Sequence, residues 1–310
     1  MTALLHPHAV PGDALVSVIS AAFAVRPELV ERGLDGLRTL GYTPQASPNV
    51  LASGPLYFAG TPETRLHDLH HAFADDEVRA IFLSRGGYGS NYLLDGLDLD
   101  LIAEGVKPLI GYSDLTSLQV WLLDQIQMPA FHGPMLAADF AREDGVHVAS
   151  LRAALAGQTY SVGVEEGMRT LRPGDTRGTL YGGCLSILVS LLGTPYEPQT
   201  EGKLLFLEDI GEKPYQVDRM LWQLRESGKL DGVRGIVFGE MLDCASPGAA
   251  PELLEEAILS ALKDFDGPIA IGLRSGHVSR QNVTLTLGVE AELHTAEEAQ
   301  LRFLEPAVTE

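Results

Sequence analysis

Short apolar runs alternate with segments of helical periodicity through the N-terminal part of the chain, and this alternation limits the fold more than any other feature. Leu15–Ser20 is rich in Val and Ile, and Glu28–Leu40 then places apolar residues at helical spacing. Further strand-like and helix-like segments follow at Pro62–Phe73, Val78–Leu83, Lys107–Tyr112 and Asp114–Gln125. Strands joined through helices form a parallel sheet covered on both faces, so the sequence predicts a doubly wound α/β domain.

The rest of the chain has a less regular pattern. A polar stretch ends in Arg172-Pro173-Gly174-Asp175, and we expect it to join two domains. The predicted organisation is an N-terminal α/β domain at 1–140, a connection at 141–177 and a C-terminal domain at 178–310. The expected later elements are strands at Lys203–Glu208, Val233–Gly239, Pro268–Ile271, Asn282–Leu287, Glu290–Leu293 and Gln300–Leu304, and helices at Tyr215–Ser227 and Pro251–Phe265. This pattern predicts a mixed α/β second domain.

Charge and cysteine content exclude several classes of protein. The 310 residues include 42 acidic and 22 basic side chains, a formal net charge of −20, and no basic stripe. Phosphate recognition depends on clustered Lys and Arg, so we predict no nucleic-acid partner and no anionic membrane partner. Cys184 and Cys244 form no CxxC pair, which argues against a disulfide framework and a structural zinc site. We expect both cysteines to be buried in a reduced, cytoplasmic protein.

The stretch Leu109–Thr116 is the clearest candidate for chemistry. A short apolar run ends at Gly111-Tyr112, Ser113 occupies the corner, and a helix is expected to follow. A serine on such a corner projects from the sheet and lies beside free backbone N–H groups, which can bind a developing oxyanion. The alternative is that Ser113 only caps the helix that begins near Leu115.

A serine nucleophile needs a base and usually an acid to orient that base. Of the nine histidines, two lie where a side chain could reach a cleft: His132 after an apolar run and His277 in a glycine-marked loop. Glu208 closes the apolar strand Leu204–Leu207, where a carboxylate is costly unless it is paired. Its partner could be a histidine, or Arg219 in a structural ion pair.

A glycine-rich segment, Ser84–Ser90, follows the strand expected at Val78–Leu83. Glycines let a backbone approach another group closely and present its N–H donors. The segment lacks the spacing of a P-loop and of a dinucleotide-binding turn. Two interpretations stay open: a phosphate-binding loop, or a second donor facing the Ser113 corner.

Several short motifs stand in a fixed order along the chain and together resemble the LD-carboxypeptidase family of serine peptidases. This family includes the muramoyl-tetrapeptide carboxypeptidases and the microcin C self-immunity peptidases. The motifs that carry the resemblance are Pro11-Gly12-Asp13, Arg85-Gly86-Gly87-Tyr88-Gly89, Gly111-Tyr112-Ser113-Asp114, His132-Gly133-Pro134, Gly182-Gly183, Leu207-Glu208-Asp209, Glu212 with Pro214-Tyr215 and Asp218-Arg219, and Gly276-His277. The resemblance covers about residues 11 to 305.

The resemblance implies a flavodoxin-like N-terminal domain, a C-terminal mixed α/β domain of swivelling type, and an active site in the cleft between them. It implies a catalytic triad of Ser113 as nucleophile, His277 as general base and Glu208 as the orienting acid. The oxyanion hole would consist of the backbone N–H groups of Asp114 and Gly87. The family needs neither metal nor cofactor and tends to form homodimers.

The function implied is hydrolysis of an L,D-peptide bond, with release of terminal D-alanine from the murein tetrapeptide. Arg85 is a candidate for binding the substrate carboxylate, although it could equally support the glycine loop. Cys184 and Tyr181 stand where many relatives have Asn and Trp, near the expected substrate cleft. Two alternatives remain: a microcin C immunity-type peptidase that cleaves aminoacyl or peptidyl nucleotides, and a non-catalytic module that binds a peptide or nucleotide.

Overall fold

The N-terminal part of the chain forms a parallel five-stranded sheet in the computed structural model, which describes residues 4–245 and 252–310. Its strands are β1 (Leu15–Ile19), β2 (Thr43–Ala46), β3 (Ala80–Leu83), β4 (Leu109–Gly111) and β5 (Ala130–His132). Their order across the sheet is β2-β1-β3-β4-β5, and every neighbouring pair is parallel. This is the strand order of flavodoxin-like folds, so the predicted doubly wound domain is confirmed.

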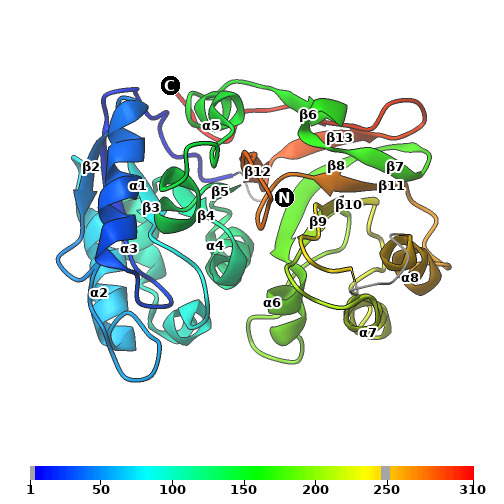
Figure 1. Cartoon of the computed structure of the whole chain (residues 1–310), viewed down its shortest axis with the longest axis horizontal. Helices are drawn as coiled ribbons and strands as arrows, with labels where there is room; N and C mark the ends of the chain where they lie inside the picture. Colours follow the sequence, from blue (N-terminus) through cyan, green and yellow to red (C-terminus); the bar gives the residue numbers. More distant parts are fainter. Residues whose placement is uncertain (1–3, 246–251) are drawn as a thin grey trace.

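Four helices cover this sheet (Figure 1). They are α1 (Pro27–Thr39), α2 (Pro62–Ala74), α3 (Leu99–Glu104) and α4 (Thr116–Ile126). In α1, Val30, Leu34 and Leu37 recur at helical spacing and are buried. Thr61 caps α2 by accepting a hydrogen bond from the backbone N–H of Thr64. Helix α1 packs against a π-helical turn at Leu136–Phe140, whereas α3 contacts both α2 and α4.

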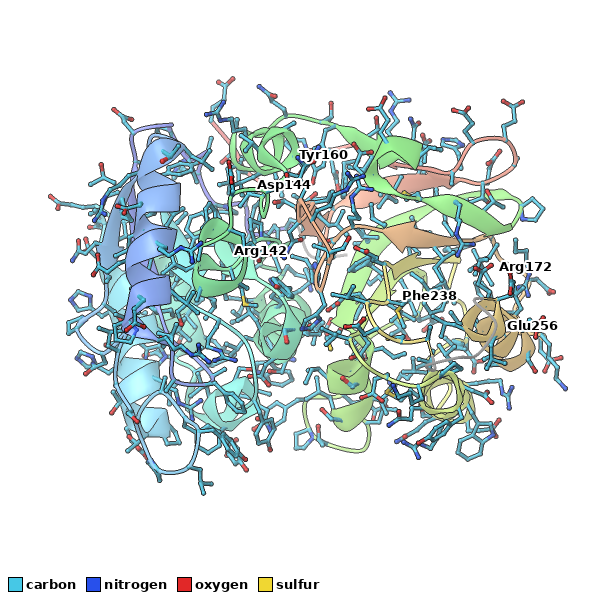
Figure 2. The ribbon with its side chains drawn as sticks, viewed as in Figure 1. Arg142, Asp144, Tyr160, Arg172, Phe238 and Glu256 are labelled. Atoms are coloured by element: carbon cyan, nitrogen blue, oxygen red, sulfur yellow. The ribbon has the colours of Figure 1, made fainter. Side chains whose placement is uncertain are left out.

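The second sheet is mixed and has eight strands. They are β6 (Ser161–Gly163), β7 (Arg169–Arg172), β8 (Asp175–Cys184), β9 (Lys203–Glu208), β10 (Gly235–Gly239), β11 (Ile269–Leu273), β13 (Glu290–His294) and β14 (Gln300–Phe303). Strands β8 to β11 are parallel neighbours, and the other pairs are antiparallel. Phe238 of β10 is fully buried in this half of the molecule (Figure 2). The mixed character of the second domain is therefore confirmed.

Four further α-helices follow in the described part of the chain; the first contacts Leu285–Leu287, and the others lie beside the second sheet (Figure 1). They are α5 (Val148–Leu155), α6 (Leu185–Ser190), α7 (Pro214–Glu226) and α8 (Leu253–Ala261). Helix α8 accounts for the helix expected from Pro251, although residue 251 itself lies outside the described residues. Across residues 4–245 and 252–310, no helix combines the length and the apolar character needed to cross a membrane.

Two segments differ from the sequence expectations and interlock the halves of the molecule. The stretch expected to be only a connection contributes β6 and β7, which form the two outer edges of the second sheet. Strand β12 (Leu285–Leu287) joins the first sheet instead of the second, antiparallel to β5. It lies between the two sheets (Figure 1). Its three residues are buried, and its pairing covers an edge of β5 that would otherwise have unpaired backbone groups.

Candidate active site

Ser113 lies at a strained corner directly after β4. Its φ is +65°, a left-handed conformation that is uncommon for a residue with a side chain and that clusters at functional sites. The turn Ser113–Leu115 and helix α4 follow, and neither begins with a side-chain cap. The capping interpretation of Ser113 is therefore not supported. A strained serine between a parallel strand and a helix has the geometry of a nucleophile elbow.

The glycine-rich segment after β3 packs directly on this corner. A Cβ atom built on Gly86 would lie 2.9 Å from Ser113 Oγ and 3.6 Å from the backbone nitrogen of Asp114. Only glycine therefore allows the backbone to approach the hydroxyl so closely. The buried Asp114 side chain fixes this arrangement, because its Oδ2 accepts a 2.7 Å hydrogen bond from the backbone N–H of Ser90.

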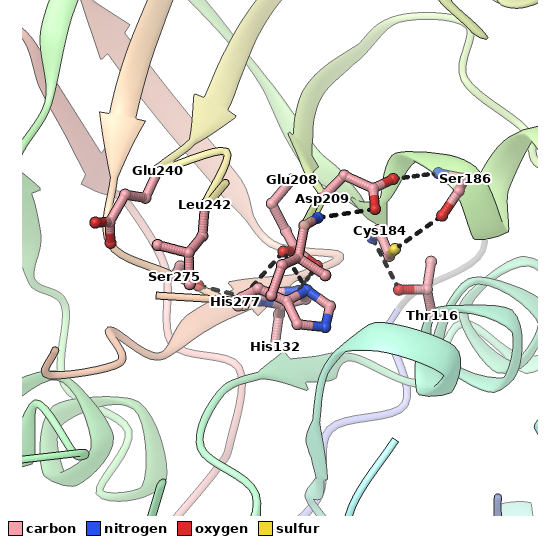
Figure 3. A network of polar contacts seen from close by, with 12 residues as sticks. Thr116, His132, Cys184, Ser186, Glu208, Asp209, Glu240, Leu242, Ser275 and His277 are labelled. Atoms are coloured by element: carbon pink, nitrogen blue, oxygen red, sulfur yellow. Dashed lines mark hydrogen bonds and ion pairs between the residues drawn. The ribbon is translucent and has the colours of Figure 1, made fainter. Parts of the chain in front are cut away.

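His277 and Glu208 form a hydrogen-bonded pair in the C-terminal half (Figure 3). His277 Nδ1 lies 2.8 Å from Glu208 Oε2, and the backbone N–H of His277 donates to the same oxygen at 3.0 Å. Glu208 is the last residue of β9 and is fully buried. Gly276 packs so tightly on it that a Cβ atom there would lie 2.5 Å from the carboxylate carbon. The pair leaves Nε2 of His277 as the free ring nitrogen.

Charge coupling within this pair favours the ionised forms of both groups. Burial opposes ionisation of Glu208, but the adjacent histidines outweigh burial and hold the pKa of Glu208 well below its ordinary value. Burial also disfavours the imidazolium of His277, yet the Glu208 carboxylate outweighs it and raises the pKa of His277 above its ordinary 6.5. An imidazolium formed at His277 during a reaction would therefore be stabilised.

Ser113 and His277 line one cleft of about 610 Å³, although they come from different sheets. Arg85, Gly86 and Gly87 line the same cleft. No hydrogen bond joins the Ser113 hydroxyl to the His277 ring in the described part of the chain; catalytic hydrogen bonds often tighten only with substrate bound. A somewhat larger hollow of about 700 Å³ lies at the β6–β14 edge, remote from this constellation.

Of the two residues predicted to contact substrate, Arg85 lines the cleft and Tyr181 does not. Arg85 lines the cleft; its guanidinium lies 5.5 Å from the Phe23 ring centroid and donates to the Ala24 carbonyl oxygen at 3.3 Å. Tyr181 does not reach the cleft. It is fully buried in β8, and its hydroxyl donates to Asp124 Oδ2 of α4 at 2.8 Å. A ring in that position ties α4 to the second sheet.

Cys184 is buried beside Glu208, as its neighbour across β8 and β9. Burial raises the pKa of its thiol well above the ordinary value, so the thiol is protonated and a poor nucleophile. Its backbone N–H donates to Thr116 Oγ1 at 3.0 Å (Figure 3). The expectation that Cys184 packs in the interior is confirmed, and so is the burial of Cys244.

Glu208 does not pair with Arg219, which is exposed on α7. The second histidine considered as a base, His132, lies instead against the other side of the Glu208 carboxylate. Sequence reasoning missed Arg65, a buried cation that donates to the carbonyl oxygens of Ala21 and Gly89 and so supports the glycine segment. No sequence motif marks Arg65. In the described ranges, no group of three or more His, Cys, Asp and Glu side chains is arranged to hold a metal ion.

Comparison with known proteins identifies the family of the chain. Residues 16–133 match the model of the LD-carboxypeptidase N-terminal domain, and residues 177–293 match that of the C-terminal domain. The chain is 36% identical to the probable murein peptide carboxypeptidase of Bacillus subtilis strain 168, over 98% of this chain and 95% of that protein.

Two solved structures share the fold. The muramoyltetrapeptide carboxypeptidase of Oxalobacter formigenes is 30% identical, covers 94% of this chain and 98% of its own, and superposes with a TM-score of 0.82. An MccF-like protein of Bacillus anthracis strain Ames is 26% identical, covers 96% and 99%, and superposes with a TM-score of 0.86. The two matched domain models together span most of the chain, and it therefore belongs to the LD-carboxypeptidase family.

Proposed function

We propose that the protein is a serine carboxypeptidase that hydrolyses an L,D-peptide bond and releases terminal D-alanine from the murein tetrapeptide. One observation supports this most strongly. A strained serine shares a cleft with a histidine whose Nδ1 lies 2.8 Å from a fully buried carboxylate. This is the arrangement of nucleophile, base and orienting acid that acyl transfer requires.

In the proposed acylation step, His277 Nε2 takes the proton of Ser113 as Oγ attacks the scissile carbonyl carbon. Glu208 keeps hydrogen on Nδ1 of His277, so that Nε2 is free to accept. When the tetrahedral intermediate collapses, the imidazolium gives its proton to the leaving amine, and the C–N bond breaks. Water then attacks the ester of Ser113 by the same route and releases the peptide acid.

The proposed oxyanion donors are the backbone N–H groups of Asp114 and Gly87. The close contact between Gly86 and Ser113 supports this choice, because it brings the backbone of the glycine segment next to the hydroxyl and the nitrogen of Asp114. Donors fixed before the reaction stabilise the developing charge without reorganisation. Arg85 is the proposed partner of the substrate carboxylate, since it lines the cleft, as Arg26 also does, and belongs to the glycine segment that packs on Ser113.

The relatives support the choice of substrate. Their names refer to murein peptides and muramoyltetrapeptide, and the chain covers nearly the whole length of both proteins. The likeness to an MccF-like protein is at lower identity. A cytoplasmic location and a homodimer remain predictions from the sequence and the family resemblance.

The test is mass spectrometry of the purified protein with a DAP-type tetrapeptide, the matching tripeptide and an aminoacyl-sulfamoyl adenosine. We expect loss of one D-alanine from the tetrapeptide only. Ser113→Ala should lower turnover on the order of 10⁴-fold, because the remaining groups can bind substrate but form no acyl-enzyme. Ser260→Ala, which changes an exposed serine on α8, is the matched control and should keep full activity.

Either of two results would contradict the proposal. Cleavage of the adenylate analogue alone would assign the protein to the nucleotide-cleaving branch of the family. Full activity in the Ser113→Ala variant would remove the serine from the mechanism.

A further inference from the structure

The Glu208 carboxylate has two oxygens, and the proposed triad uses only one of them. Oε2 accepts both hydrogen bonds from His277. Oε1 is buried and has no hydrogen-bond partner at normal distance among residues 4–245 and 252–310. A buried carboxylate oxygen without a donor is costly, so the group that faces Oε1 matters for the position of the whole side chain.

That group is His132. Its Nε2 lies 3.8 Å from Glu208 Oε1, and both side chains are fully buried. Nε2 also lacks a hydrogen-bond partner among the described residues, so two polar atoms without such a partner face each other. An approach of about 0.8 Å would bring them to ordinary hydrogen-bond distance.

Ser275 is placed to support the form of the His132 ring that can donate to Glu208. The hydroxyl of this fully buried serine lies 3.0 Å from His132 Nδ1 (Figure 3). When Ser275 donates its hydrogen to Nδ1, the hydrogen of the ring is on Nε2, directed at Oε1. The loop Ser275–His277 therefore contacts one of the two histidines beside Glu208 and supplies the other.

The backbone of His132 is fixed by two strands of the first sheet. His132 pairs with Gly111 of β4 on one side and with Leu285 of β12 on the other. Its ring packs edge-on against Phe206, with centroids 5.0 Å apart. Gly111 is two residues before Ser113, so the sheet that carries the nucleophile also carries the group that faces the acid.

We propose that His132 is a positioning residue: its Nε2–H donates to Glu208 Oε1 and fixes the carboxylate that aligns His277. This role depends on the proposed function, in which Glu208 orients the base. The proposed hydrogen bond between His132 and Glu208 also links the two sheets. Ser113 and His132 are supplied by the first sheet, Glu208 by the second, and the linkage keeps the nucleophile in register with its base.

Two variants separate positioning from packing. His132→Phe keeps a planar ring against Phe206 but removes the donor, whereas His132→Gln keeps an N–H donor at a similar reach. We expect His132→Phe to lower kcat about 10- to 100-fold with KM changed less than about threefold, since a hydrogen bond to a charged group is lost. His132→Gln should stay within about fivefold of the natural protein. Equal losses in both variants, or no loss in His132→Phe, would overturn the proposal.

A second readout does not require turnover. In protein labelled with ¹⁵N-histidine, NMR correlations assign which nitrogen of His132 carries hydrogen. We expect an Nε2–H that is protected from exchange with solvent and that shifts in a Glu208→Gln variant. Hydrogen on Nδ1 alone, or no response to Glu208→Gln, would reject the role of His132 even if none of the tested peptides is a substrate.

Discussion

Ser113, His277 and Glu208 are held by different physical means. Ser113 is held by a strained backbone, with φ of +65°. Glu208 is held by complete burial at the end of β9, and His277 by two bonds to that carboxylate. Backbone strain and a buried charge both cost free energy, so packing elsewhere in the fold must offset these two costs.

The pH dependence of catalysis tests the coupling of His277 to Glu208. The raised pKa of His277 means that its ring is protonated, and unable to act as the proposed base, at pH values where an ordinary histidine would be neutral. We therefore expect kcat/KM to fall as pH decreases, with the midpoint of this acid limb above 6.5. A Glu208→Gln variant should move the midpoint to lower pH. A midpoint below 6.5 in the natural protein would contradict the coupling.

At the scale of single residues, the sequence offered Ser113, Glu208 and His277 as candidates because each has a local signal: a corner, a polar strand end and a glycine-marked loop. His132 had a comparable signal, but its relation to Glu208 depends on which strands become neighbours. Tyr181 was expected near the substrate and instead bonds Asp124 in the interior. Successive side chains of a strand point to opposite faces of the sheet, and this sets the direction of the Tyr181 ring. The sequence did not reveal which face Tyr181 occupies, because β8 is rich in glycine.

At the scale of elements, the glycine segment after β3 packs on the corner after β4 and brings Gly86 against Ser113. Parallel neighbours end at the same edge of the sheet, and β3 pairs directly with β4. Prediction from sequence succeeded here because both strands are continuous apolar runs. It missed β2, whose sequence Thr-Pro-Gln-Ala is polar and belongs to an exposed edge strand.

A Gly86→Ala substitution tests this contact. The new methyl group would lie 2.9 Å from Ser113 Oγ and 2.8 Å from its Cβ, so either the segment or the nucleophile must move. We expect kcat/KM to fall at least about tenfold, because small displacements of reacting groups are costly. Gly12→Ala is the matched control, since nothing lies within 4 Å of a Cβ atom there. Equal activity in both variants would mean that the contact is irrelevant to catalysis.

At the scale of the whole molecule, the two sheets are not built from two separate halves of the chain. Strand β12 belongs to the C-terminal half of the chain but pairs with β5 of the first sheet. Strands β6 and β7 form the edges of the second sheet, although the sequence predicts only a connection there. These are short strands, each three or four residues long, and their pairing is decided by tertiary contacts. Local periodicity could not assign them to a sheet.

Buried carboxyl groups predict how stability of the whole fold depends on pH. Burial raises the pKa of Asp124 and of Asp139 to about 6, from 3.8. A raised folded-state pKa means that the folded protein binds more protons, so stability is lost as pH rises through about 6. Glu208 has a lowered pKa and contributes no change in this range.

We therefore expect the melting temperature to rise by several degrees as pH falls from about 7 to about 5. Asp124→Asn and Asp139→Asn should each flatten this dependence, whereas Asp35→Asn, at an exposed position on α1, should leave its slope unchanged. Thermal unfolding followed by circular dichroism measures all four proteins. A melting temperature that falls toward pH 5 would show that these carboxyl groups are not buried as described.

The most direct test of the account is the combined removal of Ser113 and His277, which come from different sheets and line one cleft. Residues that act as one catalytic unit have strongly non-additive effects. The measurement is kcat/KM on the tetrapeptide for Ser113→Ala, His277→Ala and the double variant. We predict that the double variant is no slower than Ser113→Ala alone, because the base has no function without its nucleophile. A loss in the double variant equal to the product of the two single losses would show that they act independently and would contradict the triad.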